Sequence, residues 1–421
     1  MRIVLVHNSM ANIGGAEKVG QWLCSGLSQK GHEVTLLAHA FNKKIEDSLI
    51  SQGVCCKRIT LRPVSLMNLK RRLAQFKFTF DNGIPGLKIL PWHIFDILED
   101  DVLDEIGRSI RPILTSHDVI ISNIWPVHLW IYRALKKQEK RPPILLICHE
   151  PNRELYSHIT DTHTTKGNLP VLDDHQKQLK KWDQIAFSMM DKIIANSNFT
   201  AGNTRAIYPN KDIKVAYMGF HEERARYNPS PGSSEILKIL TVNRLFYHKN
   251  VQGVIKAYSG FKKINPDLFA KTVLQVVGTG PYEENLKLLS RELGVNDKVE
   301  FTGFVGDEIL PEYYVQADLV IYLPYDEPFG LVPVEAMFWE KPVIASSHGG
   351  PSETVVDGET GYLVDPGDHT GIAKAIEKLL LNPDLRTRMG VAGKSRVENM
   401  FTFDQCIDQI EQIIREKASL L

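Results

Sequence analysis

The sequence is poor in cysteine, carries no excess charge of either sign and has no long apolar run. Its five cysteines are odd in number and lack CxxC spacing, so they indicate neither a disulfide framework nor a zinc site and favour a reducing compartment. Lysine plus arginine equals aspartate plus glutamate at 50 each, which argues against a protein that binds nucleic acid through bulk charge. No stretch approaches the ~20 apolar residues of a membrane-spanning helix, and the apolar start at Ile3–Val6 is too short for a signal peptide. We therefore expect a cytoplasmic protein.

The order of the apolar runs predicts an α/β protein. Ile3–Val6 has the pattern of a strand, a Gly14-Gly15 turn follows, apolar residues then recur at helical spacing, and GHEVTLLA returns a buried strand. Such a unit is typical of a parallel sheet with right-handed crossovers. Further candidate strands lie at Asp118–Asn123, Pro143–Glu150 and Lys192–Ser197.

The length and a break in this rhythm predict two domains. A chain of 421 residues exceeds what one hydrophobic core usually holds. Residues 221–235 are charged and then rich in Pro, Gly and Ser, as in an interdomain linker. The rhythm restarts after them, so we predict two doubly wound, Rossmann-like domains at 1–220 and 236–400 that face each other across a cleft. An amphipathic helix at 401–421 ends the sequence.

A basic stretch at 57–88 stands apart from this rhythm. Eight of its residues are lysine or arginine, and its one acid is Asp81. Leucines and phenylalanines from Leu66 to Phe80 alternate in steps of three and four, which predicts an amphipathic helix. Such a helix either lies peripherally on an anionic membrane surface or packs its apolar face into the domain with its charges in solvent.

Two basic residues follow the first strand of the second half. Arg244 and Lys249 lie in VNRLFYHKN, in a loop at the carboxyl end of a strand, where open α/β sheets bind their ligands. The planar fork of arginine and the compact charge of lysine together suit a diphosphate. The alternative is a pair of solvated surface charges.

Glycine turns follow two of the predicted strands. Gly14-Gly15 leads into a helix, and the backbone amides of such a turn form a ready anion site. Gly278 and Gly280 in VVGTGP form a GxG that lacks the third glycine of the dinucleotide fingerprint. Each turn is either purely structural or lets a phosphate or a base approach the backbone.

His149 and Glu150 end a predicted strand of the first half, in ICHEPNREL. A lone histidine at a strand end is either a satisfied structural group or, on the cleft side of the sheet, a group that reaches the ligand.

The stretch DEPFGLVPVEAM carries two carboxylates, Glu327 and Glu335, around a predicted helix start. We expect Pro333 to be the first helical residue, which places Glu335 in the first turn and Glu327 in the loop before it. Backbone amides at 329–331 and the helix dipole suit an anion, and the carboxylates suit hydroxyls, so the stretch predicts a phosphorylated, polyhydroxylated ligand. The alternatives are an acid/base pair around a scissile bond and two surface charges.

Taken together, the motifs resemble a known family, the retaining GT-B glycosyltransferases of family 4, or group 1. The resemblance covers nearly the whole sequence and is carried by GGAEKV, ANSNFTA, VNRLFYHKN, VVGTGP, FTGFV, EPFGLVPVEAM, PVIASSHGGPSE and GETGYLV. Two glutamates with seven residues between them are the mark of that family. Within it, VNRLFYHKN and EPFGLVPVEAMFWEKPVIA look most like the GDP-mannose-dependent mannosyltransferases of lipid-linked oligosaccharide and O-antigen assembly. Asn243 departs from the pattern, since many members have glycine there.

The resemblance implies a role for each matching position. It implies donor binding by Gly15, Arg244, Lys249, Gly278, Phe304, Glu327, Phe329, Gly330, Leu331 and Glu335, and catalysis by His149, Glu327, Arg244 and Lys249. Arg244 and Lys249 would hold the donor diphosphate, and Glu335 would bind the ribose hydroxyls. Glu327, with the amides of 329–331, would contact the transferred sugar, and His149 would assist reaction at its anomeric carbon. Phe304 would lie against the base, and Gly15 near the phosphate or the acceptor.

The resemblance also implies partners and a mechanism. Residues 1–220 would bind a glycan or lipid-linked acceptor, residues 236–400 the nucleotide sugar, and helix 401–421 would return to the first domain. Front-face substitution with retention would need no metal ion, because Arg and Lys neutralise the leaving diphosphate. GDP-mannose is the favoured donor and a UDP-sugar the alternative. The rival functions are a sugar-nucleotide epimerase, a nucleotide-sugar-binding protein with a dead site, and a dehydrogenase, for which the third glycine is lacking.

Overall fold

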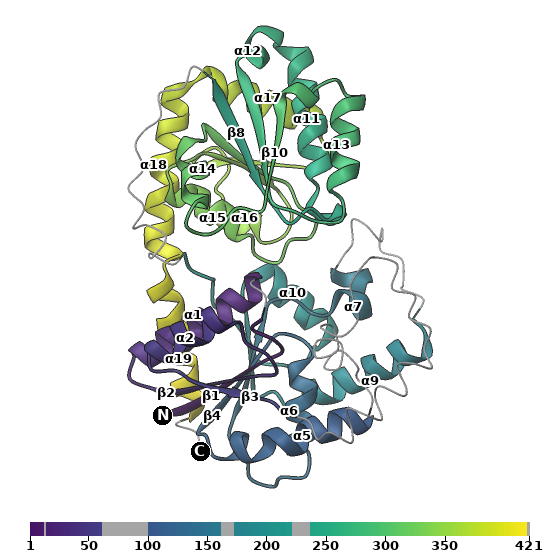
Figure 1. Cartoon of the computed structure of the whole chain (residues 1–421), viewed down its shortest axis with the longest axis vertical. Helices are drawn as coiled ribbons and strands as arrows, with labels where there is room; N and C mark the ends of the chain where they lie inside the picture. The colour runs from purple at the N-terminus through teal and green to yellow at the C-terminus, as the bar shows by residue number, and fades with distance from the viewer. Residues whose placement is uncertain (12–13, 61–99, 161–171, 221–235, 419–421) are drawn as a thin grey trace.

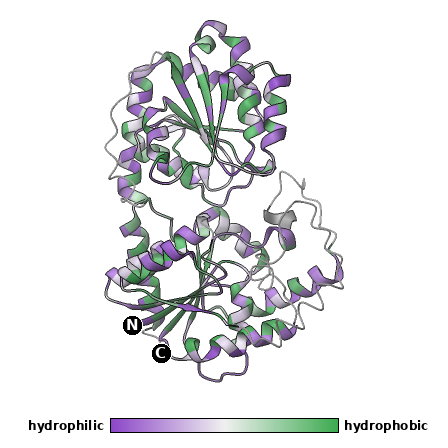
Figure 2. Ribbon diagram, in the orientation of Figure 1, coloured by the Kyte–Doolittle hydropathy of each residue, from purple (hydrophilic) through white to green (hydrophobic). Residues whose placement is uncertain are grey.

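Buried strands alternate with amphipathic helices to form two parallel sheets, one in each half of the molecule (Figure 1). The structure is a computed structural model of the whole chain, and it describes residues 1–11, 14–60, 100–160, 172–220 and 236–418. Strands are mostly apolar and lie inside, whereas polar residues gather on the outer faces of the helices (Figure 2).

The first domain holds a seven-stranded parallel sheet in the order β3-β2-β1-β4-β5-β6-β7. Its strands are β1 (Arg2–His7), β2 (Glu33–Ala38), β3 (Cys55–Arg58), β4 (Val119–Asn123), β5 (Ile144–Cys148), β6 (Lys192–Ala195) and β7 (Ile213–Val215). Its helices are α1 (Gly15–Gln29), α2 (Lys43–Ser51), α5 (Asp100–Thr115), α6 (Val127–Leu135), α7 (Arg153–Thr160), α9 (Asp174–Ser188) and α10 (Asn198–Ile207). Every residue of β4 and β5 is buried, as expected of central strands covered on both faces.

The second domain holds a six-stranded parallel sheet in the order β10-β9-β8-β11-β12-β13. Its strands are β8 (Leu237–Val242), β9 (Thr272–Val277), β10 (Val299–Gly303), β11 (Leu319–Tyr322), β12 (Val343–Ser346) and β13 (Gly361–Val364). Its helices are η2 (Tyr247–Lys249), α11 (Val251–Ile264), α12 (Pro266–Ala270), α13 (Glu283–Glu292), η3 (Asn296–Lys298), α14 (Leu310–Gln316), α15 (Leu331–Phe338), α16 (Pro351–Thr354), α17 (His369–Leu381) and α18 (Pro383–Met400).

The chain returns to the first domain beside the point where it left. The amide of Phe220 donates to the Phe401 carbonyl at 2.7 Å, and the amide of Phe403 donates back to Phe220 at 3.0 Å. A Cβ at Gly219 would lie 2.1 Å from the carbonyl oxygen of Thr402, so only glycine permits this contact. The last helix, α19 (Phe403–Ala418), then packs on α1, where Ile407 fills the space left by Gly26 (Figure 1).

Two sequence-based expectations need correction here. Helix α15 begins at Leu331 and not at Pro333, so Glu335 is its fifth residue and lies beyond the first turn. Gly330 adopts φ +85° and caps the helix, and Pro333 is tolerated as the third residue because that N–H would have no intrahelical partner anyway.

The second correction concerns the basic stretch. Lys57 and Arg58 belong to strand β3, and Arg58 pairs with Glu46 of α2 at 2.5 Å. The remainder of the predicted amphipathic helix and the predicted linker at 221–235 lie outside the described residues. Within the described ranges, every helix is too short or too polar to cross a bilayer.

Candidate active site

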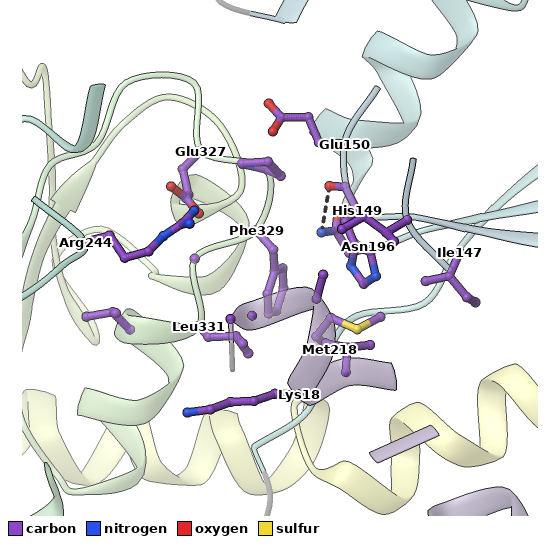
Figure 3. A pocket seen from close by; sticks show the side chains of 18 of the residues that line it. Lys18, Ile147, His149, Glu150, Asn196, Met218, Arg244, Glu327, Phe329 and Leu331 are labelled. Carbon is purple, nitrogen blue, oxygen red and sulfur yellow. Dashed lines mark hydrogen bonds between the residues drawn. The ribbon is translucent and has the colours of Figure 1, made fainter. Parts of the chain in front are cut away.

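A cleft of about 1210 Å³ lies between the carboxyl ends of the two sheets. Every residue predicted for the site lines it, namely Gly15, His149, Arg244, Lys249, Gly278, Phe304, Glu327, Phe329, Gly330, Leu331 and Glu335. In Figure 3, Lys18, His149, Glu150 and Asn196 of the first domain face Arg244, Glu327, Phe329 and Leu331 of the second. The parallel sheets therefore bring residues from distant parts of the sequence to one place.

An ion pair forms the centre of the second-domain wall. Lys249 Nζ lies 2.6 Å from Glu327 Oε2, and each side chain is 13% exposed. Burial favours protonation of Glu327, but the charges of Lys249, Arg153 and His248 outweigh it and lower the pKa of this carboxyl. Glu327 therefore stays ionised at neutral pH and keeps a cation beside it.

Glu335 is held on the same wall by a tyrosine. Tyr314 of α14 donates its hydroxyl to Glu335 Oε2 at 2.7 Å, and Glu335 is 9% exposed. This bond orients the carboxylate at the edge of the cleft. By contrast, Arg244 is exposed and its side chain lines the open cleft. Its guanidinium lies 5.6 Å from the ring centre of Phe246.

Gly278 has a structural requirement for glycine. Its φ is +125°, and a Cβ there would lie 1.9 Å from the backbone oxygen of Asn243. We expect Gly278→Ala to lower the free energy of unfolding by at least about 3 kcal/mol, from backbone strain plus steric overlap, in urea denaturation. Gly294→Ala is the matched control, because Gly294 has φ +63° but open space around it. It should cost about 1 kcal/mol; equal losses at the two positions would contradict the importance of the close approach.

His149 follows β5 and is held by two asparagines at the ends of neighbouring strands. Asn123 Oδ1 lies 2.7 Å from His149 Nε2, and Asn196 donates to the His149 backbone oxygen at 3.0 Å, the dashed line in Figure 3. The amide group of Asn123 also donates from Nδ2 to the Ala16 carbonyl at 3.4 Å, which turns Oδ1 toward His149. The proton of a neutral His149 is therefore on Nε2 and the lone pair on Nδ1.

Burial keeps His149 neutral, because it lowers the pKa of this imidazole to about 4. The neighbouring His7 at the end of β1 has its pKa lowered to about 3, by burial first and by His149 second. His149 thus faces the Lys249–Glu327 ion pair as an uncharged hydrogen-bonding group.

Sequence reasoning did not find Arg153, which joins the two walls. Its guanidinium pairs with Glu150 of the first domain and donates to the Asp326 carbonyl of the second at 2.7 Å. The only local signal was an arginine four residues after His149. Burial raises the pKa of Glu150 to about 7, against the opposing charge of Arg153 and with a smaller contribution from Glu327.

The raised pKa of Glu150 predicts a pH-dependent stability. Well below pH 4.5 the Glu150 carboxyl is protonated in both the folded and the unfolded protein. Between pH 4.5 and about 7 the unfolded chain releases this proton first, so the folded state loses stability as the pH rises. We expect wild type to lose up to about 3 kcal/mol relative to Glu150→Gln between pH 4.5 and 8, measured by urea denaturation. Taking the difference in the free energy of unfolding between wild type and Glu150→Gln removes the contribution of the other titratable groups. Parallel curves of this free energy against pH for the two proteins would contradict the raised pKa of Glu150.

At one rim of the cleft, α1 and α2 of the first domain lie near the turn that follows β10 in the second domain. Lys18 Nζ lies 2.7 Å from Asp307 Oδ1, and the more exposed Lys44 lies 3.5 Å from Glu308. Phe304 is 79% exposed beside this turn and offers a free aromatic face to a ligand in the cleft.

Comparison with known proteins identifies the family. A family model described as "Glycosyl transferases group 1" matches residues 226–396. The chain is 26% identical to alpha-1,3/1,6-mannosyltransferase alg-2 of Neurospora crassa, over 98% of this chain and 90% of that protein. Residues 226–396 form a group 1 glycosyltransferase domain, and the chain is a glycosyltransferase. The family predicted from the motifs is thereby confirmed.

Two further comparisons concern the fold of the whole chain and the sequence of one part of it. The glycosyltransferase superposes on Anabaena HepE, solved in complex with UDP and glucose, with a TM-score of 0.73 and 18% identity over 98% of this chain and 99% of that one. This likeness confirms the GT-B fold. A GDP-mannose-dependent alpha-(1-6)-phosphatidylinositol monomannoside mannosyltransferase of Mycolicibacterium smegmatis is 35% identical, over 41% of this chain and 46% of that protein.

Proposed function

We propose that the glycosyltransferase moves mannose from GDP-mannose to a glycan or lipid-linked acceptor with retention at the anomeric carbon. The observation that carries the proposal is the Lys249–Glu327 pair with Glu335 nearby, facing a neutral His149 across the cleft. The names of the Neurospora and Mycolicibacterium relatives support mannose and, in the second case, GDP-mannose.

In this proposal the second domain binds the donor. Arg244 and Lys249 neutralise the diphosphate, so no metal ion is needed for that purpose, and Glu335 accepts hydrogen bonds from the ribose hydroxyls. Phe304 lies against the base, and Gly278 lets the nucleotide approach the backbone. Glu327 and the amides of Phe329, Gly330 and Leu331 contact the mannosyl group.

The first domain contributes to the transfer step. The bond between the anomeric carbon and the diphosphate oxygen breaks with its electron pair leaving on the diphosphate. The acceptor hydroxyl forms the new bond on the same face and passes its proton to the departing phosphate oxygen. Lys249 and Arg244 stabilise the charge that develops on the leaving group, chiefly by electrostatics. His149 accepts a hydrogen bond from a mannosyl hydroxyl at Nδ1, which its Asn123 partner leaves unprotonated.

The side of the cleft near α1 and α7 is left for the acceptor. Gly15 and Lys18 of α1 line that side together with Trp125 and Arg153. Closure of the domains excludes water and so suppresses hydrolysis of the donor.

A thermal-shift panel of GDP, UDP, GDP-mannose and UDP-sugars tests the donor, because a ligand at 100 Kd stabilises by about 2.7 kcal/mol. We expect GDP and GDP-mannose to give the largest shifts. Proton NMR of the transferred sugar then reports retention. Larger shifts with uridine nucleotides would favour the UDP-sugar alternative, and turnover without an acceptor that yields an isomeric nucleotide sugar would favour an epimerase.

A further inference from the structure

The two domains also meet at a contact between α16 and the start of α10, which we call the joint. The backbone amides of Asn198 and Phe199 donate to the two carboxylate oxygens of Glu353, each at 2.8 Å. The Asn198 side chain and the Tyr217 hydroxyl also donate to Glu353 Oε2, both at 3.0 Å. Glu353 belongs to the second domain, and its four donors belong to the first.

The start of a helix explains the strength of this contact. The first turn of α10 has amides without intrahelical partners and the positive end of the helix dipole. Ser197, the N-cap residue, accepts from the amide of Thr200 at 2.9 Å. Glu353 accepts the two amides before it, so a carboxylate from one domain completes the helix cap of the other.

The same joint touches the donor-binding loop. The hydroxyls of Ser197 and Thr200 both donate to the Pro328 carbonyl, which follows Glu327. On the other side, the amide of Gly350 donates to the Glu327 carbonyl at 2.7 Å. The loop that carries Glu327 is thus held between the start of α10 and the turn that precedes Glu353.

On the first-domain side, the joint reaches His149. Asn196 directly precedes the N-cap residue Ser197, and its side chain donates to the His149 backbone oxygen at 3.0 Å. A short path therefore runs from Glu353 through the first residues of α10 to Asn196 and His149. A shift of α10 against α16 would change the separation of His149 and Glu327.

We infer that Glu353 is a positioning residue, which sets the distance between Glu327 and His149 by capping α10 from the opposite domain. This inference rests on the proposed function for its catalytic consequence, but the capping contact itself does not. At the rim formed by α1, α2 and the turn after β10, Lys44 and Glu308 are 89% and 79% exposed, and such exposed pairs contribute little. The Lys18–Asp307 pair beside them is 23% and 48% exposed.

The test is Glu353→Gln, which keeps the shape but places an amide group against amide donors. We expect kcat to fall about tenfold, because small misplacements of reacting groups are costly, while the Kd for GDP changes less than about twofold. The fraction of donor hydrolysed instead of transferred should rise. Small-angle scattering should give a larger radius of gyration than wild type, and this readout needs no substrate.

Three further variants serve as controls for Glu353→Gln. Glu359→Gln is the matched control, since Glu359 is exposed six residues further along, and it should behave as wild type. Glu353→Asp, which keeps the charge, should recover part of kcat. Tyr217→Phe removes one donor and should raise the hydrolysed fraction in the same direction, which keeps the test valid if Glu353→Gln folds poorly.

An unchanged kcat, hydrolysed fraction and radius of gyration in Glu353→Gln would overturn the inference. So would a lowered melting temperature with these three quantities unchanged, since that pattern indicates a purely structural cap. If wild type transfers no sugar from any nucleotide sugar, the proposed function fails, whereas the scattering comparison still decides on the joint.

Discussion

Replacing Lys249 with alanine should lower kcat/KM for sugar transfer by on the order of 10³-fold or more, with the fold retained. Lys249 Nζ lies 2.6 Å from Glu327 and is largely withdrawn from water, so in the proposed mechanism its charge would act on the leaving diphosphate with little screening. Loss of one preorganised charge of this kind typically costs 10²- to 10³-fold or more. The substitution also leaves Glu327 buried without its main partner, so the pKa of this carboxyl should rise.

Steady-state kinetics and calorimetry with two ligands separate these effects. Lys249→Ala should weaken binding of the nucleoside diphosphate and leave binding of the bare nucleoside unchanged, because only the diphosphate meets the lysine. Lys374→Ala is the matched control, since Lys374 is exposed on α17 and away from the cleft. Equal transfer rates in Lys249→Ala and wild type, with circular dichroism unchanged, would remove Lys249 from the site.

Glu335→Ala should lower kcat/KM by on the order of 10²- to 10⁴-fold, mainly through a raised KM for the donor. A buried carboxylate that accepts two ribose hydroxyls makes two charge-assisted hydrogen bonds, each contributing about 1.5–3 kcal/mol. Glu335→Gln keeps the volume and one acceptor, so its kcat/KM should lie between that of Glu335→Ala and that of wild type. The loss in both variants is in binding, because Glu335 does not touch the reacting carbon in the proposed arrangement.

A deoxyribose ligand tests the contact directly. Wild type should bind GDP more tightly than 2′-deoxy-GDP, and this preference should shrink toward unity in Glu335→Ala. Tyr314→Phe is the companion variant, since it removes the hydroxyl that orients Glu335 at 2.7 Å and should weaken both ligands by a smaller factor. A preference for GDP that survives in Glu335→Ala would assign the ribose contact to another group.

Much of the cleft lining could be predicted because its residues follow strands directly. Arg244 comes two residues after β8, Gly278 directly after β9, and His149 directly after β5. The carboxyl ends of parallel strands share one edge of a sheet, so an apolar run followed by a polar residue already places that residue. The start of α15 was predicted two residues late, because the pattern around Pro333 gave no sign that Gly330 would adopt φ +85° and cap the helix.

The sequence by itself determined the alternation of strands and helices and the edge of each sheet at which polar residues collect, because both depend on neighbours along the chain. Only the tertiary structure decided that Asn123 orients His149, that Arg153 joins the walls and that Glu353 caps α10 across the domains. Asn198 and Glu353 are 155 residues apart in sequence, and their contact depends on how two separately folded sheets dock. No local periodicity encodes such docking, because it arises from the summed shape and charge of two complete surfaces.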